Sequence, residues 1–127
     1  MKHMPLILLI EDDADIRSSV AEFLQGEGYS VAEAASASRA LDVLRTSRPD
    51  AIILDYALPD ATDGAEFLVQ KAKRMEVASI PVIVTTGYAL PPEVHGAAAI
   101  LPKPFDVDRL LELIRRLAPL PDATTAA

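Results

Sequence analysis

Acidic, hydroxyl and ammonium side chains stand at the ends of several apolar runs in this sequence. Glu11, Asp12 and Asp13 follow the run LILLI, and Asp55 follows AIIL. Thr85 and Thr86 close IPVIVTT, and Lys103 follows AAILP. If these runs are neighbouring parallel strands, three or four carboxylates, a hydroxyl and an ammonium converge, because a site in such a sheet lies at the carboxyl ends of its strands.

Such a group of side chains predicts phosphoryl transfer to a carboxylate. Carboxylates that lie close together raise one another's pKa unless a cation joins them. Oxygen ligands with retained water suit Mg²⁺, and a lysine ammonium adds a positive charge for a phosphoryl group. In these surroundings Asp55 can act as a nucleophile and form an aspartyl phosphate, a reaction that depends mainly on positioning and charge.

The alternation of apolar patterns predicts the elements that would position these residues. Alternating strands and helices indicate βαβ units, and their right-handed crossovers give an α/β fold with a doubly wound parallel sheet. Strands are expected at residues 6–10, 30–35, 51–55, 80–87 and 98–104, and helices within residues 14–29, 36–50, 64–76 and 107–120.

Apolar residues at helical spacing mark the faces that the helices are expected to turn toward the sheet. They are Ile16, Val20, Phe23 and Leu24; Ala37, Ala40, Leu41 and Leu44; Phe67, Leu68 and Ala72; and Leu110, Leu111, Ile114 and Leu117. Asp13 stands just before the first helix, where an acid caps the helix and favours its dipole.

Four segments resemble, in order, the signature blocks of the response-regulator receiver domain. They are LLIEDDADIR, IILDYALPDATDGAEFL, PVIVTTGYA and LPKPF, and the resemblance covers residues 5 to about 118. It implies a flavodoxin-like, five-stranded sheet of order 2-1-3-4-5. It also implies a domain that takes a phosphoryl group from a phosphohistidine donor in a Mg²⁺-dependent reaction and signals by a conformational change.

The resemblance implies a role for each matching residue. Asp55 matches the phospho-accepting aspartate, and Lys103 matches the lysine that contacts the phosphoryl group. Glu11 and Asp12 match the acidic pair that organises Mg²⁺, with Asp12 favoured as the direct ligand. Ala57 matches the position whose backbone carbonyl coordinates the metal.

The later motifs imply the switch residues. Thr86, rather than Thr85, matches the switch hydroxyl. The peptide bond before Pro104 matches one that is usually cis in the family, a conformation open to proline. Ile100 takes the place of the Tyr or Phe that often precedes the lysine by three residues, and Tyr88 is considered as a substitute for that aromatic residue.

The sequence also departs from the family pattern. The stretch between Thr86 and Lys103 is short and interrupted by prolines and a glycine, so the fourth helix is expected to be short or vestigial. The segment LPDATDGAEF carries one extra residue, which lengthens the loop beside the site. Ala57 and Tyr88 occupy positions that tune dephosphorylation in the family. Because alanine cannot orient an attacking water and tyrosine could shield the acyl phosphate, slow self-dephosphorylation is expected.

Composition narrows the class of protein. A chain of 127 residues suits one domain, and the absence of cysteine excludes disulfides and thiolate sites. With 12 basic and 19 acidic residues, the net charge of −7 argues against binding to nucleic acid or to an anionic membrane. We expect a cytoplasmic protein with a receiver domain at 5–118, an N-terminal extension or cloning remnant at 1–4 and a flexible tail at 119–127.

The expected partner is a sensor histidine kinase or a histidine phosphotransfer protein, and the expected state is a monomer or weak homodimer. The chain is expected to be a phospho-acceptor rather than an enzyme, with self-phosphorylation and self-dephosphorylation as its chemistry. A receiver fragment of a larger hybrid kinase or regulator remains an alternative. A Mg²⁺-dependent phosphatase is disfavoured because Ala57 stands where a second acid is needed. A nucleotide- or flavin-binding domain is disfavoured because EDDADIR replaces a glycine-rich turn. A purely structural interaction module also remains open.

Overall fold

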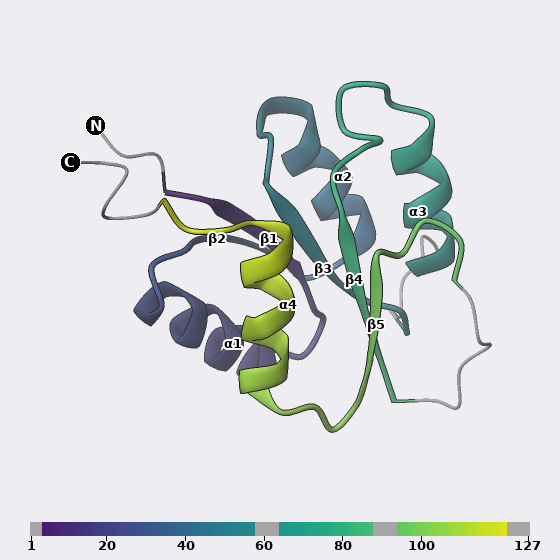
Figure 1. Cartoon of the computed structure of the whole chain (residues 1–127). Helices are drawn as coiled ribbons and strands as arrows, with labels where there is room; N and C mark the ends of the chain where they lie inside the picture. The colour runs from purple at the N-terminus through teal and green to yellow at the C-terminus, as the bar shows by residue number, and fades with distance from the viewer. Residues whose placement is uncertain (1–3, 58–63, 88–93, 122–127) are drawn as a thin grey trace.

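Five short strands form one parallel sheet in the computed structural model, which describes residues 4–57, 64–87 and 94–121 (Figure 1). The strands are β1 (Leu6–Ile10), β2 (Ser30–Ala34), β3 (Ala51–Asp55), β4 (Val82–Thr86) and β5 (Ala99–Pro102). Their order is β2-β1-β3-β4-β5, and every neighbouring pair is parallel. The predicted fold class and strand order are therefore confirmed.

Helices cover both faces of this sheet. Those within the described residues are α1 (Ala14–Gly26), α2 (Ala37–Thr46), α3 (Gly64–Ala72) and α4 (Val107–Leu117). Figure 1 shows α1 and α4 on one face and α2 and α3 on the other. Each face has its own hydrophobic core, so the central strands are enclosed on two sides.

The continuous apolar run of β1 follows from this enclosure. Ile7 and Leu9 pack into the core beneath α1 and α4, whereas Leu8 and Ile10 pack into the core beneath α2 and α3. Successive side chains of a strand point to opposite faces, so a strand buried on both faces needs apolar residues at every position. β1 is therefore held at the centre of the sheet, and its last residue leads directly to Glu11.

A capping residue defines where α1, the helix after Glu11 and Asp12, begins. The Asp13 carboxylate accepts the backbone N–H groups of Asp15 and Ile16, at 2.9 and 3.1 Å. It therefore satisfies N–H groups that the first turn of α1 leaves without helical partners. The predicted cap at Asp13 is confirmed.

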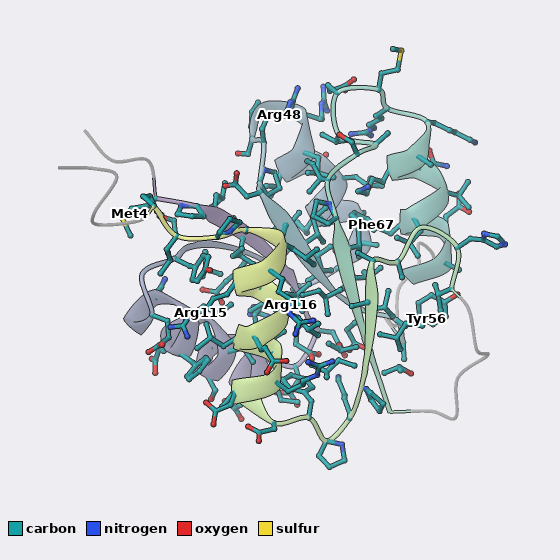
Figure 2. All side chains as sticks on the ribbon, viewed as in Figure 1. Met4, Arg48, Tyr56, Phe67, Arg115 and Arg116 are labelled. Carbon is teal, nitrogen blue, oxygen red and sulfur yellow. The ribbon has the colours of Figure 1, made fainter. Side chains whose placement is uncertain are left out.

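The expectation that Ile16 and Ala72 face the sheet is wrong, because both residues are exposed. Ile16 is 39% exposed, because it lies in the first turn of α1 beyond the edge of the core. In α3 the buried positions are Gly64, Phe67, Leu68 and Lys71, whereas Ala72 is exposed. Figure 2 labels Phe67, which lies between α3 and the strands. The buried positions have helical spacing, and the apolar pattern missed Lys71 because its side chain ends in a charge.

The connection between β4 and β5 was expected to have a short fourth helix at most. Among the described residues of this connection there is a turn and no helix: the Ala97 N–H donates to the Val94 carbonyl at 3.1 Å. Residues 88–93 lie outside the described residues, and so does the lengthened loop at 58–63. In the described part of this connection the expected shortening is thus confirmed.

The packed part of the chain extends beyond the predicted domain end at residue 118. Leu120 is half-buried against the core beneath α1 and α4, and one of its methyl groups lies 3.3 Å from the position that a Cβ at Gly28 would occupy. The Tyr29 hydroxyl donates to the Ala118 carbonyl at 2.9 Å. The chain after α4 is thus tied to the turn between α1 and β2.

Candidate functional site: a carboxylate cluster with a bridging lysine

The register of the sheet brings the predicted site residues to one edge. Ile10 of β1 pairs with Leu54 of β3, so the next residues, Glu11 and Asp55, emerge side by side. Asp55 in turn pairs with Thr85 of β4. Because all the strands are parallel, their carboxyl ends form a single crevice, as expected for a site in a doubly wound sheet.

Lys103 joins the two strands at the centre of this site. Its Nζ donates to Glu11 Oε1 at 3.1 Å and to Asp55 Oδ2 at 3.3 Å. Both carboxylate-bearing residues are only 4% exposed. The second carboxylate oxygen of Asp55, Oδ1, accepts the backbone N–H of Ala57 at 3.1 Å. The Asp55 carboxylate is therefore held at both oxygens, and one of its partners is a cation.

A third carboxylate completes the cluster. Glu11, Asp12 and Asp55 each place one carboxylate oxygen within 4.8 Å of the others, and Asp12 is exposed. Three carboxylates face one ammonium here, which leaves negative charge for a further cation. An all-oxygen donor set with one side open to water fits Mg²⁺, which keeps several waters in protein sites. The donor chemistry of these residues therefore fits the magnesium ion that the sequence predicts.

Burial and charge determine the proton affinity of two members of the cluster. Burial raises the pKa of Glu11 from 4.5 to about 7, because a carboxylate away from water loses hydration, and the nearby Asp55 charge adds to this effect. Burial alone would lower the pKa of Lys103, but its hydrogen bond to Glu11 and the charges of Asp55 and Glu11 raise that pKa overall. Lys103 therefore stays a cation across the physiological pH range.

Arg17 supports the cluster from behind, and the sequence reasoning gave it no role. Its guanidinium donates from Nη1 to the Glu11 carbonyl at 2.9 Å, and its Nε lies 3.3 Å from Glu33 Oε1 on β2. The Glu11 N–H donates to the Ala34 carbonyl at 3.1 Å. The backbone of Glu11 is thus held at both its N–H and its C=O. The available signal was an arginine one turn into the helix that follows the acidic pair.

The switch candidates occupy the ends of β4 and β5. Thr86 is buried, and its backbone carbonyl accepts the Lys103 N–H at 2.6 Å. Thr85 is also buried, opposite Asp55 in the strand ladder, as expected for a strand residue. The Lys103–Pro104 peptide bond is cis, which confirms that prediction.

Three further candidates are Ile100, Tyr88 and Ala57. Ile100 is half-buried and packs against the core beneath α2 and α3. Tyr88 lies outside the described residues. Ala57 is exposed at the edge of the cluster, directly after Tyr56, which is labelled in Figure 2.

Within the described residues, no helix combines the length and apolar composition that a membrane crossing requires.

Known proteins share both the sequence pattern and the fold. The chain is 35% identical to sporulation initiation phosphotransferase F of Bacillus subtilis (strain 168), over 90% of this chain and 94% of that protein. It is 36% identical to response regulator MprA of Mycobacterium avium (strain 104), over 95% of this chain and 56% of that protein. The chain therefore spans about half the length of this second relative.

Solved structures give the same result. Chemotaxis response regulator CheY4 of Vibrio cholerae superposes with a TM-score of 0.82 at 29% identity, over 91% of this chain and 99% of that chain. The CheY-like receiver domain protein of Methanospirillum hungatei JF-1 superposes with a TM-score of 0.80 at 32% identity, over 90% and 93% of the two chains.

The family comparison covers the same part of the sequence as the fold and the site. Residues 7–115 match the family described as the response regulator receiver domain, a range that begins in β1 and ends in α4. With the strand order, the carboxylate cluster and these relatives, the chain belongs to the response regulator receiver domain family.

Proposed function

We propose that this receiver domain accepts a phosphoryl group on Asp55 in a Mg²⁺-dependent reaction. The observation that carries the proposal is the placement of Lys103, whose ammonium bridges Glu11 and Asp55 where β1 and β3 end. As a receiver domain of two-component signalling, the chain is a phospho-accepting module. Asp55 is buried, and its carboxylate combines a cationic partner with a backbone N–H donor.

In the proposed reaction an Asp55 carboxylate oxygen attacks the phosphorus of a phosphohistidine. A new O–P bond forms, the P–N bond breaks, and its electron pair leaves with the imidazole of the donor. Lys103 places a positive charge where the phosphoryl oxygens arrive, and the Ala57 N–H orients the carboxylate. The protein supplies positioning and charge, which is what phosphoryl transfer requires.

Asp12, Glu11 and Asp55 are the side chains that would hold Mg²⁺, and the Ala57 backbone carbonyl is a fourth proposed ligand. Bound there, the ion would neutralise charge on the transferring phosphoryl group. Asp12 is the proposed direct ligand because its exposed carboxylate can enter the coordination sphere without breaking a described ion pair. Glu11 is paired with Lys103 and would act from the buried side.

The proposed signal runs through β4 and β5. Thr86 and Lys103 are joined through the backbone, because the Lys103 N–H donates to the Thr86 carbonyl. A phosphoryl group on Asp55 would add oxygen acceptors beside both residues. The Thr86 hydroxyl is the proposed switch that reports the modification to the surface around these strands.

The proposed partner is a sensor histidine kinase or a histidine phosphotransfer protein, acting in the cytoplasm. The name of the B. subtilis relative, a phosphotransferase, supports a role in transfer between proteins. We assign the receiver domain to residues 5–118, with Leu120 packed against its core just after this boundary, and expect a monomer or weak homodimer. Its own chemistry would be confined to self-phosphorylation and self-dephosphorylation.

Intact-mass measurement tests the assignment of Asp55. Incubation with Mg²⁺ and acetyl phosphate is expected to add one phosphoryl group to the wild-type chain and none to Asp55→Asn. Asp42→Asn makes the same chemical change at an exposed position on α2 and should be phosphorylated like the wild type. An adduct that persists in Asp55→Asn, or its absence from the wild type, would show that Asp55 is not the acceptor.

A further inference from the structure

Gly64, the first residue of α3, lies against the backbone of Tyr56 beside the acceptor. A Cβ at Gly64 would be 2.8 Å from Tyr56 Cα, 2.8 Å from the Tyr56 carbonyl oxygen and 3.0 Å from a carbon of the Tyr56 ring. The first two contacts are to backbone atoms, so no side-chain rotation relieves them. A side chain at residue 64 would therefore force the start of α3 and the Tyr56 backbone apart.

The displaced group is part of the acceptor's hydrogen bonding. The Tyr56 carbonyl and the Ala57 N–H belong to the same peptide unit, which is planar and moves as one body. That N–H donates to Asp55 Oδ1 at 3.1 Å. The Tyr56 N–H on the other side is fixed to the Thr85 carbonyl at 2.9 Å. A shift of the Tyr56 carbonyl would therefore rotate this peptide and change the position of the Ala57 N–H relative to Asp55 Oδ1.

We propose that Gly64 is a positioning residue for the acceptor: its missing side chain sets the orientation of the Tyr56–Ala57 peptide, and this peptide orients the Asp55 carboxylate. The part of this inference that concerns the rate of phosphorylation rests on the proposed function of Asp55. Its structural part concerns the Ala57 N–H, which can be observed without metal or phosphodonor.

Gly64→Ala tests the proposal, and Gly26→Ala is its matched control. Gly26 ends α1, and a Cβ there would have no neighbouring atom within 4 Å. Gly64→Ala is expected to shift the Ala57 amide resonance in the magnesium-free protein. It is also expected to slow phosphorylation of Asp55 by acetyl phosphate about tenfold at saturating Mg²⁺, since misplacing a reacting group by about 1 Å can cost about a hundredfold. Gly26→Ala should leave both unchanged.

A second pair of variants tests the proposal if Gly64→Ala does not fold. If Gly64→Ala is unfolded, the double variant Gly64→Ala/Tyr56→Ala removes the ring contact and keeps the two backbone contacts. Measured against Tyr56→Ala alone, it should show the same shift and the same slowing. An unshifted Ala57 resonance with a rate within about twofold of the reference protein overturns the proposal. Failure of Asp55→Asn to abolish the wild-type adduct would instead overturn the proposed function, and the Ala57 resonance would still decide the role of Gly64.

Discussion

At the scale of single residues, the site is organised by one lysine that faces several acids. Lys103 pairs with Glu11 and Asp55, and Asp12 adds a third carboxylate within reach of a shared cation. The charges in this cluster do not balance without an added cation. Proton uptake by Glu11 is one way in which the metal-free protein reduces the excess, since the pKa of Glu11 is raised by burial and by Asp55.

This proton should compete with Mg²⁺. Because the pKa of Glu11 is raised from 4.5 to about 7, the metal-free folded protein holds a proton on Glu11 through that range. The apparent Mg²⁺ affinity is therefore expected to rise with pH, by up to about tenfold per pH unit below pH 7 for the release of one proton. Calorimetric titration of Mg²⁺ at several pH values measures this slope, and Glu11→Gln should flatten it. A flat profile in the wild type would show that Glu11 is already ionised.

The same shift has a consequence for the stability of the metal-free protein. The folded state binds more protons than the unfolded state between the two pKa values, so the free energy of unfolding falls as pH rises from 4.5 to about 7. Bound Mg²⁺ should reduce this loss, because it favours the ionised form of Glu11.

At the scale of elements, each helix beside the site begins or packs in a way that serves the strand ends. α1 begins at the Asp13 cap and carries Arg17 back to the Glu11 carbonyl. α3 begins at Gly64, where close packing against Tyr56 requires the absence of a side chain. Further along α3, Lys71 is only 4% exposed, and its Nζ donates to the Ala78 carbonyl at 2.8 Å in the connection to β4.

Replacing Lys71 with methionine should stabilise the protein. Burial lowers the pKa of Lys71, so its ammonium form carries a desolvation cost in the folded state at neutral pH. Methionine keeps the length of the side chain and removes that cost but leaves the Ala78 carbonyl without this donor. We expect a net gain of about 1 kcal/mol in the free energy of unfolding at pH 7, in line with apolar replacement of buried charges.

Urea unfolding across a pH series measures both parts of this prediction. A lysine whose folded pKa lies below 10.5 makes the wild type more stable as pH rises toward 10.5, because the unfolded state then binds more protons. Lys71→Met should lose this trend. Lys73→Met, at an exposed position in the same connection, is the control and should retain it. A loss of stability in Lys71→Met would mean that the hydrogen bond to Ala78 outweighs the desolvation cost.

At the scale of the whole molecule, two helical layers hold the sheet and leave its carboxyl edge for chemistry (Figure 1). At the opposite end of α4, Tyr29 and Leu120 tie the chain after the last helix to the turn between α1 and β2. The proposed acceptor, Asp55, is therefore placed between two packed layers, whereas its surroundings at the edge include the exposed Ala57.

The lifetime of the aspartyl phosphate should depend on Ala57, at the edge of the site. Ala57 has no polar group with which to orient an attacking water, so the aspartyl phosphate is expected to persist for minutes or longer rather than decay within seconds. Ala57→Asn should shorten the lifetime by about tenfold. This change is smaller than the rate increase of about a hundredfold that a positioned general base commonly provides. Intact-mass measurements after removal of the phosphodonor follow the decay. Decay of the wild type within seconds would contradict the prediction.

Much of the fold could be predicted because its causes are local. The runs LILLI and AIILD are apolar at nearly every position, as strands buried on both faces must be, and the predicted strands overlap all five observed ones. Parallel order then brings Glu11, Asp55 and Lys103 to one edge, so these members of the site followed from strand ends. The inward face of α3 was partly mispredicted, because hydropathy cannot reveal a lysine whose charge finds a buried carbonyl.

The sequence by itself determined the βαβ order, the acids at the strand ends and the cap at Asp13, since each depends on neighbours within a few positions. Tertiary structure alone decided that Lys103 bridges two strands, that Arg17 holds the Glu11 carbonyl and that Gly64 lies against Tyr56. These contacts depend on how separate elements pack against one another. Their atomic distances are set by the packing of the whole molecule, which no local pattern encodes.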